Sequence, residues 1–281
     1  MIVVADSGSS KTDWRIIDKN EIQQISSIGL NPDFVNESQV KDVVEDAFKS
    51  INVNEVKQLF FYGSGSSSKS RKSVVNNGLE KVFLNAKIEI EHDLLGAARA
   101  ACGRNRGLAA ILGTGSNCCL FDGENIIKSY RSGGYIIGDE GGGVDFGKRI
   151  IKAFIEDKMP IDLRDKFDFR YKLNVDDILK KIYKEDFPNR FLASFSNFIY
   201  QNKNHPFIVE LISSSFRSFF ENQVLRFTIQ KGTPMNAVGS IAYFYHDYFR
   251  AIAEEYSIPV GNIIEKPIAA LTLYHQSLNL D

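Results

Sequence analysis

The chain has 281 residues, and its 34 Lys plus Arg residues nearly balance its 35 Asp plus Glu residues, giving a formal net charge of −1 at pH 7. Without a basic excess, the composition argues against nucleic acid and anionic membranes as partners. Three cysteines with no CxxC spacing argue against a disulfide framework and against a cysteine-bound zinc. No apolar run reaches the ~20 residues of a membrane span and no signal-peptide pattern is present, so we expect a cytoplasmic protein.

The first hundred residues alternate between strand and helix patterns. Short β-branched or alternating apolar runs predict strands, whereas apolar residues at steps of three and four predict helices. We therefore predict strands at residues 2–6, 12–18, 21–28, 57–62 and 87–91, and helices at residues 40–51, 70–84 and 94–102. The first three strands are expected to form an antiparallel meander.

The same pattern restarts at residue 107. We predict strands at residues 107–112, 117–121, 125–130, 234–238 and 262–264, and helices at residues 146–155, over most of 160–225, at 241–255 and from 267 onward. This alternation with short loops predicts an α/β fold in which each half has a mixed sheet flanked by helices. A boundary near residues 103–107 would divide the chain into domains 1–105 and 106–281.

A loop rich in Gly, Ser and Thr follows the first strand of each half. In the first loop, at residues 6–12 (DSGSSKT), Gly8 frees the backbone, and successive N–H groups can form an anion-binding concavity. Asp6, at the strand end, could hold Mg²⁺ through water. The second loop, at residues 113–116 (GTGS), has the same character. An ordinary turn would explain either loop alone, but two loops at equivalent places favour phosphate binding.

Three further segments carry polar chemistry. Asp93 stands between a strand and a helix, where it can cap the helix, accept a proton from a substrate hydroxyl, or do both. Two carboxylates lie among glycines at residues 134–143 (GYIIGDEGGG), which suggests a polar site or simply a helix start rich in negative charge. A strand runs into a helix through Gly-Ser at residues 237–242 (AVGSIA), a weak signal for a planar ring lying against the backbone.

Taken together, these motifs resemble the acetate/sugar kinase–Hsp70–actin superfamily and, more narrowly, the BadF/BadG/BcrA/BcrD ATPase family, which includes N-acetylglucosamine kinases. The first loop is similar to the family's DGGxTKT phosphate-1 motif, and GTGSN at residues 113–117 is similar to its phosphate-2 motif. GDEGGG at residues 138–143 resembles the GDEGS signature, and AVGSIA resembles the adenosine motif. The resemblance implies two actin-like (ribonuclease H-like) α/β domains around a nucleotide cleft, with ATP and Mg²⁺ as cofactors.

The resemblance also implies roles for single residues. Asp93, in the HDLLGA context, matches the catalytic base, and Asp6 would hold the metal. The nucleotide contacts would come from Ser7, Gly8, Ser9, Ser10, Lys11, Thr12, Gly113, Thr114, Gly115, Gly239 and Ser240. The sugar contacts would come from Asn31, Ser116, Asn117 and Asp139. Animal-type N-acetylglucosamine kinases carry a tryptophan in a GGW-type stretch before GDEG, whereas this chain has Tyr135 there and its single tryptophan at Trp14.

The expected activity is phosphorylation of an amino sugar such as N-acetylglucosamine at its 6-hydroxyl, with ATP as the phosphoryl donor. A homodimer is compatible with this expectation. The alternative is an ATPase activator of a 2-hydroxyacyl-CoA dehydratase-type reductase, which needs an iron–sulfur cluster held by cysteines. Cys102, Cys118 and Cys119 lack a convincing spacing for that cluster. A sugar-responsive regulator would need a helix-turn-helix before the first strand, and the sequence shows none.

Overall fold

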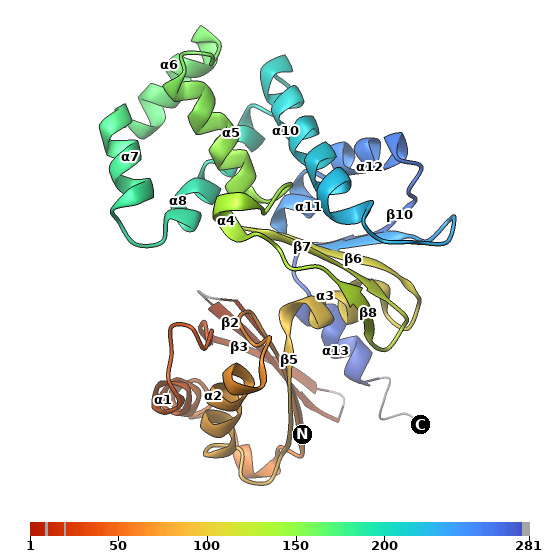
Figure 1. Ribbon diagram of the computed structural model, residues 1–281. Coiled ribbons are helices and arrows are strands. Elements are labelled where there is room, and N and C mark those ends of the chain that lie inside the picture. Colours follow the sequence, from red (N-terminus) through yellow and green to blue (C-terminus); the bar gives the residue numbers. More distant parts are fainter. Residues whose placement is uncertain (9–10, 20, 277–281) are drawn as a thin grey trace. The chain divides into compact units, whose positions relative to one another are not determined.

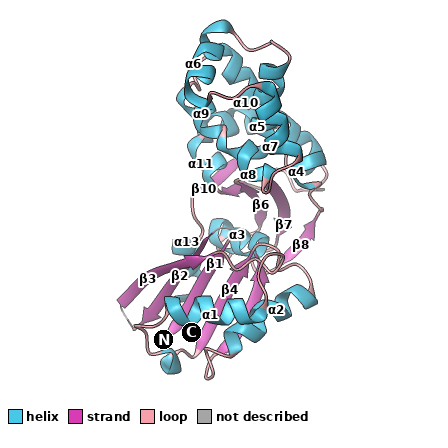
Figure 2. Ribbon diagram, turned by 90° about the vertical axis from the view of Figure 1, so that its left-hand side faces the viewer, coloured by secondary structure: helices cyan, strands magenta, loops and turns pink. Residues whose placement is uncertain are grey.

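The computed structural model describes residues 1–8, 11–19 and 21–276. Its contacts divide the chain into two compact units, the first of residues 1–104, 123–125 and 266 onward, and the second of residues 105–122 and 126–265. Within the described residues each unit contains one mixed sheet of five strands flanked by helices, which confirms the predicted α/β class (Figures 1 and 2).

The sheet of the first unit has the strand order β3-β2-β1-β4-β5. Strands β1, β2 and β3 are antiparallel neighbours, whereas β4 and β5 run parallel to β1. The strands are β1 Ile2–Ser7, β2 Lys11–Asp18, β3 Glu21–Ile28, β4 Gln58–Gly63 and β5 Lys87–His92. The helical elements are α1 Glu37–Ala47, the 3₁₀ turn η1 Val53–Glu55, α2 Lys69–Glu80, α3 Asp93–Cys102 and α13 Ile268–Gln276.

Helices cover both faces of this first sheet. On the face of α1 and α2, Trp14 is fully buried and meets the ring of Phe48 edge-on at 5.2 Å between centroids, so the single tryptophan is a core residue. On the other face, α3 and α13 pack together, and Leu271 of α13 is buried with Val4 and Tyr62. The C-terminal helix therefore belongs to the first unit and not, as the sequence predicted, to a second domain spanning residues 106–281.

The sheet of the second unit, ordered β10-β9-β6-β7-β8, repeats the topology of the first. Strands β7 and β8 continue antiparallel from β6, whereas β9 and β10 lie parallel to it on the other side. The strands are β6 Gly107–Leu112, β7 Ser116–Phe121, β8 Ile126–Ser129, β9 Met235–Val238 and β10 Val260–Ile264. The restart of the pattern at residue 107 is thus a second copy of the same fold.

Long insertions of helix build the core of the second unit. Figure 1 shows α5 and α10 side by side above the sheet, with α6 at the top and α7 and α8 on the left, where α8 packs on α5. The helices are α4 Gly134–Ile137, α5 Gly143–Ile155, α6 Ile161–Tyr171, α7 Val175–Tyr183, α8 Pro188–Ser194, α9 Ser196–Gln201, α10 Pro206–Phe219, the π-helical turn η2 Phe220–Val224, α11 Ser240–Phe244 and α12 His246–Glu255. Fully buried phenylalanines such as Phe146, Phe167 and Phe216 fill the core.

Candidate functional site

The polar residues of the first unit meet at one edge of its sheet. Strands β1, β4 and β5 are parallel, and their registers pair Ser7 with Gly63 and Gly63 with His92. Asp6 at the end of β1 and Asp93 just after β5 therefore lie at the same edge. Strand β3 also runs parallel to β1, so Asn31, three residues beyond it, belongs to this edge as well.

Two predicted phosphate-loop hydroxyls are engaged inside the unit. Ser7 Oγ lies 2.8 Å from Thr12 Oγ1 and accepts a hydrogen bond from the backbone N–H of Leu30. Thr12 Oγ1 donates to the carbonyl oxygen of Ile28 at 3.0 Å. These bonds fix the β1–β2 hairpin, which the Gly8 N–H closes by donating to the Lys11 carbonyl, but they commit both hydroxyls to protein partners. The predicted Ser9 and Ser10 contacts lie outside the described residues.

Asp93 is the first residue of α3, and the cap of this helix is His92. The Nδ1 atom of His92 accepts the backbone N–H of Leu95 at 3.3 Å, and burial lowers the pKa of the imidazole, which fits this acceptor role. The prediction that Asp93 caps a helix starting at residue 94 was therefore wrong by one residue. Asp93 Oδ1 instead accepts the N–H of Leu94 at 2.8 Å.

Burial makes the carboxyls at this edge unusually basic. The pKa of Asp93 rises to about 6, mainly because burial disfavours the charged form, although backbone hydrogen bonds lower it. The pKa of Asp6 rises to about 7, first through burial and then through the negative charges of Asp93 and Asp13. A carboxylate with such a pKa is ionised at pH 7 to a useful extent and is a much better proton acceptor than an exposed one.

Asp6 and Asp13 also form the part of this edge best suited to a metal ion. They face each other across the antiparallel β1–β2 pair, and Asp13 forms an ion pair with Lys11 at 2.6 Å. Within residues 1–8, 11–19 and 21–276, no three His, Cys, Asp or Glu side chains come together as a metal-binding group. Two hard carboxylates nevertheless fit Mg²⁺, which typically takes one or two protein carboxylates and completes its shell with water and substrate phosphates.

In the second unit, the loop after β6 is tied to the start of α5. The N–H groups of Gly143 and Val144 donate to the carbonyl oxygens of Gly113 and Thr114 at 2.8 and 2.9 Å. Gly239, at the end of β9, approaches the same loop from the other side, since a Cβ on it would lie 2.4 Å from the carbonyl oxygen of Leu112. With φ at +122°, this position also requires glycine. The phosphate-2, GDEGGG and adenosine segments are thus one connected structure.

Asp139 joins the GDEGGG segment to the phosphate-2 loop. Its Oδ1 accepts the backbone N–H of Ser116 at 3.2 Å and the hydroxyl of Ser132 at 2.8 Å, and its backbone has a positive φ of +60°. Gly115 packs so closely on this carboxylate that a Cβ there would lie 2.7 Å from Oδ2. The neighbouring predicted sugar contact, Asn117, accepts the N–H of Cys118 through its Oδ1 atom.

Sequence reasoning missed several polar residues around this loop. Gln223 Nε2 donates to Ser116 Oγ at 2.7 Å and to Glu140 at 3.2 Å. Gln223 lies in the stretch 160–225 that the sequence predicted only as mostly helical, and no local motif could have revealed it. Asp145 is buried and bonded to Ser215 and Arg149, and here the four-residue spacing of Asp145 and Arg149 on one helix was an available signal.

A cavity of about 330 Å³ adjoins the adenosine motif within the second unit. Ser240, Ile241 and Phe244 of the motif and its helix line one side, and Tyr200 of α9 lines the other, with its ring 5.6 Å from that of Phe244. The full lining is Ser196, Asn197, Tyr200, Ser240, Ile241, Phe244 and Tyr245. Aromatic and small polar groups around a hollow of this size suit a planar heterocycle.

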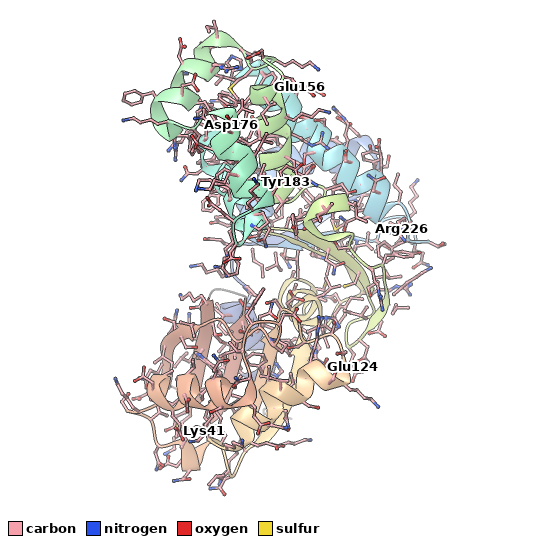
Figure 3. All side chains as sticks on the ribbon, turned by 60° about the vertical axis from the view of Figure 1, so that its left-hand side comes forward. Lys41, Glu124, Glu156, Asp176, Tyr183 and Arg226 are labelled. Carbon is pink, nitrogen blue, oxygen red and sulfur yellow. The ribbon has the colours of Figure 1, made fainter. Side chains whose placement is uncertain are left out.

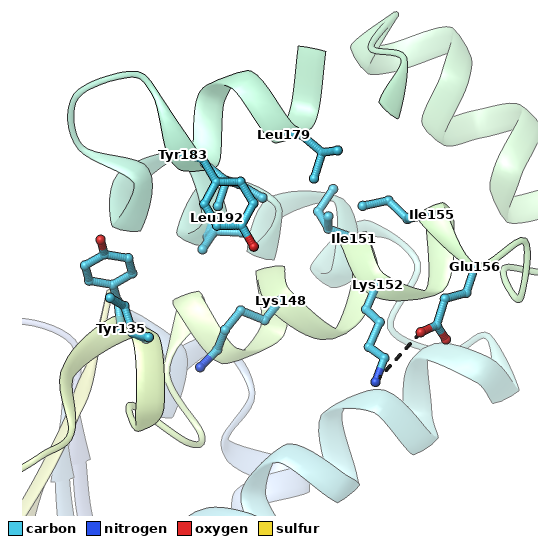
Figure 4. Close-up of a pocket in the computed structure, with 11 residues that line it drawn as sticks. Tyr135, Lys148, Ile151, Lys152, Ile155, Glu156, Leu179, Tyr183 and Leu192 are labelled. Carbon is cyan, nitrogen blue, oxygen red and sulfur yellow. Dashed lines mark ion pairs between the residues drawn. The ribbon is translucent and has the colours of Figure 1, made fainter. Parts of the chain in front are cut away.

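A second cavity of about 360 Å³ in this unit is lined by both apolar and charged side chains (Figure 4). Its walls come from α4, α5, α7 and α8, and Lys152 pairs with Glu156 at its edge. Tyr135 lines it together with Tyr183, which is 78% exposed at the end of α7 (Figure 3). Its lining contains none of the predicted nucleotide or sugar residues.

The fold and the repeated loops define the class of protein. Two mixed sheets of identical topology, each with a loop after its first strand, are the architecture of actin-like ATPases and sugar kinases, and the chain superposes on a ROK hexokinase of Thermus thermophilus with a TM-score of 0.51 at 12% identity. No helix in the described part of the chain is long and apolar enough to span a bilayer. No family model matches the sequence.

Three comparisons narrow the relationship. A protein of Porphyromonas gingivalis named as a candidate N-acetylglucosamine kinase is 34% identical, with 99% of this chain and 100% of that chain covered and a TM-score of 0.93. This chain therefore belongs to the same family of sugar-kinase-fold proteins. An N-acetylmuramic acid/N-acetylglucosamine kinase of Clostridium acetobutylicum is 25% identical over 213 residues, 70% of this chain and 69% of the relative. A Chromobacterium violaceum structure, named as a candidate N-acetylglucosamine kinase, shares the fold with a TM-score of 0.74 at 13% identity, covering 97% of this chain and 98% of its own.

Proposed function

We propose that the protein transfers the γ-phosphoryl group of ATP to the 6-hydroxyl of an amino sugar such as N-acetylglucosamine. The observation that carries this proposal is the 34% identity over the full length of both chains with the Porphyromonas gingivalis protein. The Clostridium acetobutylicum relative, whose name includes two N-acetylated amino sugars, supports the substrate class. The motifs favour membership of the BadF/BadG/BcrA/BcrD ATPase family within the larger superfamily.

In this proposal Asp93 is the catalytic base. Its position at the sheet edge and the raised pKa of its carboxyl suit it to accept the proton of the 6-hydroxyl as that oxygen attacks phosphorus. The bond from hydroxyl oxygen to the γ-phosphorus forms while the bond to the β–γ bridging oxygen breaks, and ADP leaves. Since phosphoryl transfer depends mainly on positioning and charge stabilisation, a single well-placed carboxylate is sufficient as the general base.

The remaining groups bind and orient the substrates. The phosphates would be held by backbone N–H groups of the two loops and by Lys11, and the base would occupy the cavity beside Ser240. Asp6 would hold Mg²⁺, which neutralises phosphate charge when bound. Asn31, Ser116, Asn117 and Asp139 are the proposed sugar contacts. We expect a cytoplasmic enzyme. A homodimer is a further hypothesis, which a measurement of the molecular mass in solution would test.

The alternative, an ATPase activator with a cysteine-bound iron–sulfur cluster, has less support. Cys102, Cys118 and Cys119 are all buried, at 5%, 2% and 0% exposure, whereas a cluster shared by two subunits needs cysteines at a surface. Cys118 and Cys119 are neighbours on β7, so their side chains point to opposite faces of the sheet. They are thus poorly placed to ligate one cluster together.

A panel of amino sugars incubated with ATP and Mg²⁺, with ADP release as the signal, tests the proposal. We expect turnover with N-acetylglucosamine or a close N-acylated relative, and ³¹P NMR of the product should show a phosphate on the 6-oxygen. ADP release that is independent of every sugar, accompanied by iron and colour in the purified protein, would instead support the activator.

A further inference from the structure

Asp6 and Asp13 are an unusual pair because like charges directly oppose each other in the sheet. The β1–β2 register places the two residues opposite one another, so their side chains emerge on the same face. Directly opposed residues have Cβ atoms roughly 4.5–5.5 Å apart, and two carboxylates at that separation destabilise a strand pair. Asp13 is 9% exposed, so water can screen this repulsion only weakly.

The positive charge nearby does not balance these carboxylates. Among the described residues, Asp6, Asp13 and Asp93 together form one ion pair, which joins Lys11 Nζ and Asp13 Oδ1. The Lys11 side chain is 54% exposed, and the pair therefore has little stabilising value of its own. Of these three carboxyl groups only Asp13 has an ion-pair partner among the described residues, so negative charge gathers where the phosphate-1 loop begins.

We propose that Asp13 is a second magnesium ligand, which holds the ion together with Asp6 across the β1–β2 hairpin. The inference rests on the proposed function, from which the need for Mg²⁺ follows. A carboxylate has two oxygens and about four acceptor positions, so Asp13 can keep Lys11 on Oδ1 and offer its other oxygen to a cation. A divalent ion between the two carboxylates would also remove the repulsion that the bare strand pair bears.

The competing explanation is that Asp13 only positions the Lys11 ammonium for phosphate. The two roles differ in a measurable way, because Lys11→Met removes the ion pair but leaves both carboxylates. A ligand role predicts that Lys11→Met keeps or strengthens metal binding, since a competing cation is gone. A purely positioning role predicts that Asp13→Asn and Lys11→Met behave alike.

The test is direct metal binding to the full-length protein without nucleotide or sugar. Mn²⁺, a paramagnetic substitute for Mg²⁺, is titrated against wild type, Asp6→Asn, Asp13→Asn and Lys11→Met, and free Mn²⁺ is counted by electron paramagnetic resonance. Asp18→Asn is the matched control, since Asp18 is an exposed aspartate at the other end of the same strand. We expect the Mn²⁺ affinity to fall at least tenfold in Asp6→Asn and Asp13→Asn and to stay unchanged in Asp18→Asn.

Thermal unfolding of the same proteins gives an independent readout. Without divalent ions, Asp13→Asn should melt at a higher temperature than wild type because the repulsion is relieved, and added MgCl₂ should stabilise wild type more than the variant. Wild-type Mn²⁺ affinity in Asp13→Asn, or no Mn²⁺ binding by wild type, would overturn the proposal. Neither result depends on sugar phosphorylation, so a failed kinase assay with intact Mn²⁺ binding would reject the proposed function and leave this inference standing.

Discussion

The carboxylate of Asp139 accepts a hydrogen bond from the backbone N–H of Ser116 at 3.2 Å. This bond connects the GDEGGG segment to the phosphate-2 loop. The hydroxyl of Ser132 donates a second hydrogen bond to the same carboxylate oxygen at 2.8 Å. In this position Asp139 adopts a left-handed backbone conformation, which non-glycine residues rarely adopt. The arrangement gives Asp139 a loop-holding role that is compatible with, and independent of, the proposed contact to sugar.

Gly115→Ala should therefore disturb the loop, and Gly113→Ala should not. A Cβ at Gly115 would lie 2.7 Å from the Asp139 carboxylate, whereas a Cβ at Gly113 meets nothing within 4 Å. We expect Gly115→Ala to lower the unfolding free energy by about 1–3 kcal/mol, the usual cost of a forced steric rearrangement. Urea unfolding measures the difference. Equal stability of the two variants would show that Asp139 moves aside without cost.

Arg149→Met should be one of the more destabilising single changes in the second unit. Asp145 is 6% exposed and receives Arg149 Nε at 2.8 Å, so the variant would leave a buried carboxylate without its cation. Breaking such a pair costs about 3 kcal/mol or more. Lys152→Met is the control on the same helix, because its 3.8 Å pair with Glu156 is exposed and should contribute less than about 1 kcal/mol. Similar denaturation midpoints for both variants would contradict this assignment.

The aromatic wall of the cavity beside Ser240 should contribute to nucleotide affinity. We expect Tyr200→Ala to weaken ATP binding by about 1–3 kcal/mol, the value of stacking a base on an aromatic side chain, while tripolyphosphate binding stays unchanged. Tyr200→Phe should retain most of the affinity, and Tyr183→Ala, outside this cavity, is the control. Calorimetric titration separates the two ligands, and equal losses for ATP and tripolyphosphate would place the base elsewhere.

Local patterns predicted the strands well because each strand is a short run that is either apolar or rich in β-forming residues, and the order of strands and helices is repeated. Residues 21–28 and 107–112 are strands with the bounds that their β-forming residues and their apolar content, respectively, predicted. The assignment of α13 failed because packing on α3 and β1, rather than anything in its own sequence, joins it to the first unit. The predicted helix at residues 241–255 is divided at Tyr245, whose hydroxyl bonds the Ser196 carbonyl at 2.6 Å.

The candidate site shows the same limit. Asp6, Asp93 and Gly115 could be named as candidates because each belongs to a contiguous motif at a strand end. Gln223 and Tyr200 reach the motifs only through the folded helices, so no sequence window contains both partners. The role of His92 as cap was missed because histidine is a less common cap than the aspartate beside it.

The raised carboxyl pKa values predict a stability that falls as pH rises. Asp6 and Asp93 have folded-state pKa values of about 7 and about 6, above the ordinary value of 3.8, so the folded state holds these protons more tightly than the unfolded state. Their stabilising contribution is complete below about pH 4 and is lost as pH rises through 6 and 7. Without divalent ions, the melting temperature of Asp6→Asn relative to wild type should increase between pH 5 and pH 8. A difference in melting temperature that does not change with pH would contradict this prediction.

Asp93→Asn separates general-base catalysis from structure. His92 caps α3, and an asparagine oxygen can still accept the Leu94 N–H that Asp93 Oδ1 accepts at 2.8 Å, so the melting temperature at neutral pH should stay close to wild type or rise as a buried charge is removed. Turnover should fall about 10²–10⁴-fold, because an amide cannot take the proton of the sugar hydroxyl. ATP affinity should be unchanged.

The pH profile completes this test. For wild type, kcat/KM should decline about tenfold per unit below the pKa of Asp93, about 6, since only the ionised carboxylate acts as base. The residual activity of Asp93→Asn should lack this acid limb when Mg²⁺ is saturating. A variant with wild-type turnover and an unchanged acid limb would remove Asp93 from the mechanism. The search for the base would then turn to Asp139 and Glu140, the two carboxylates of the glycine-rich turn.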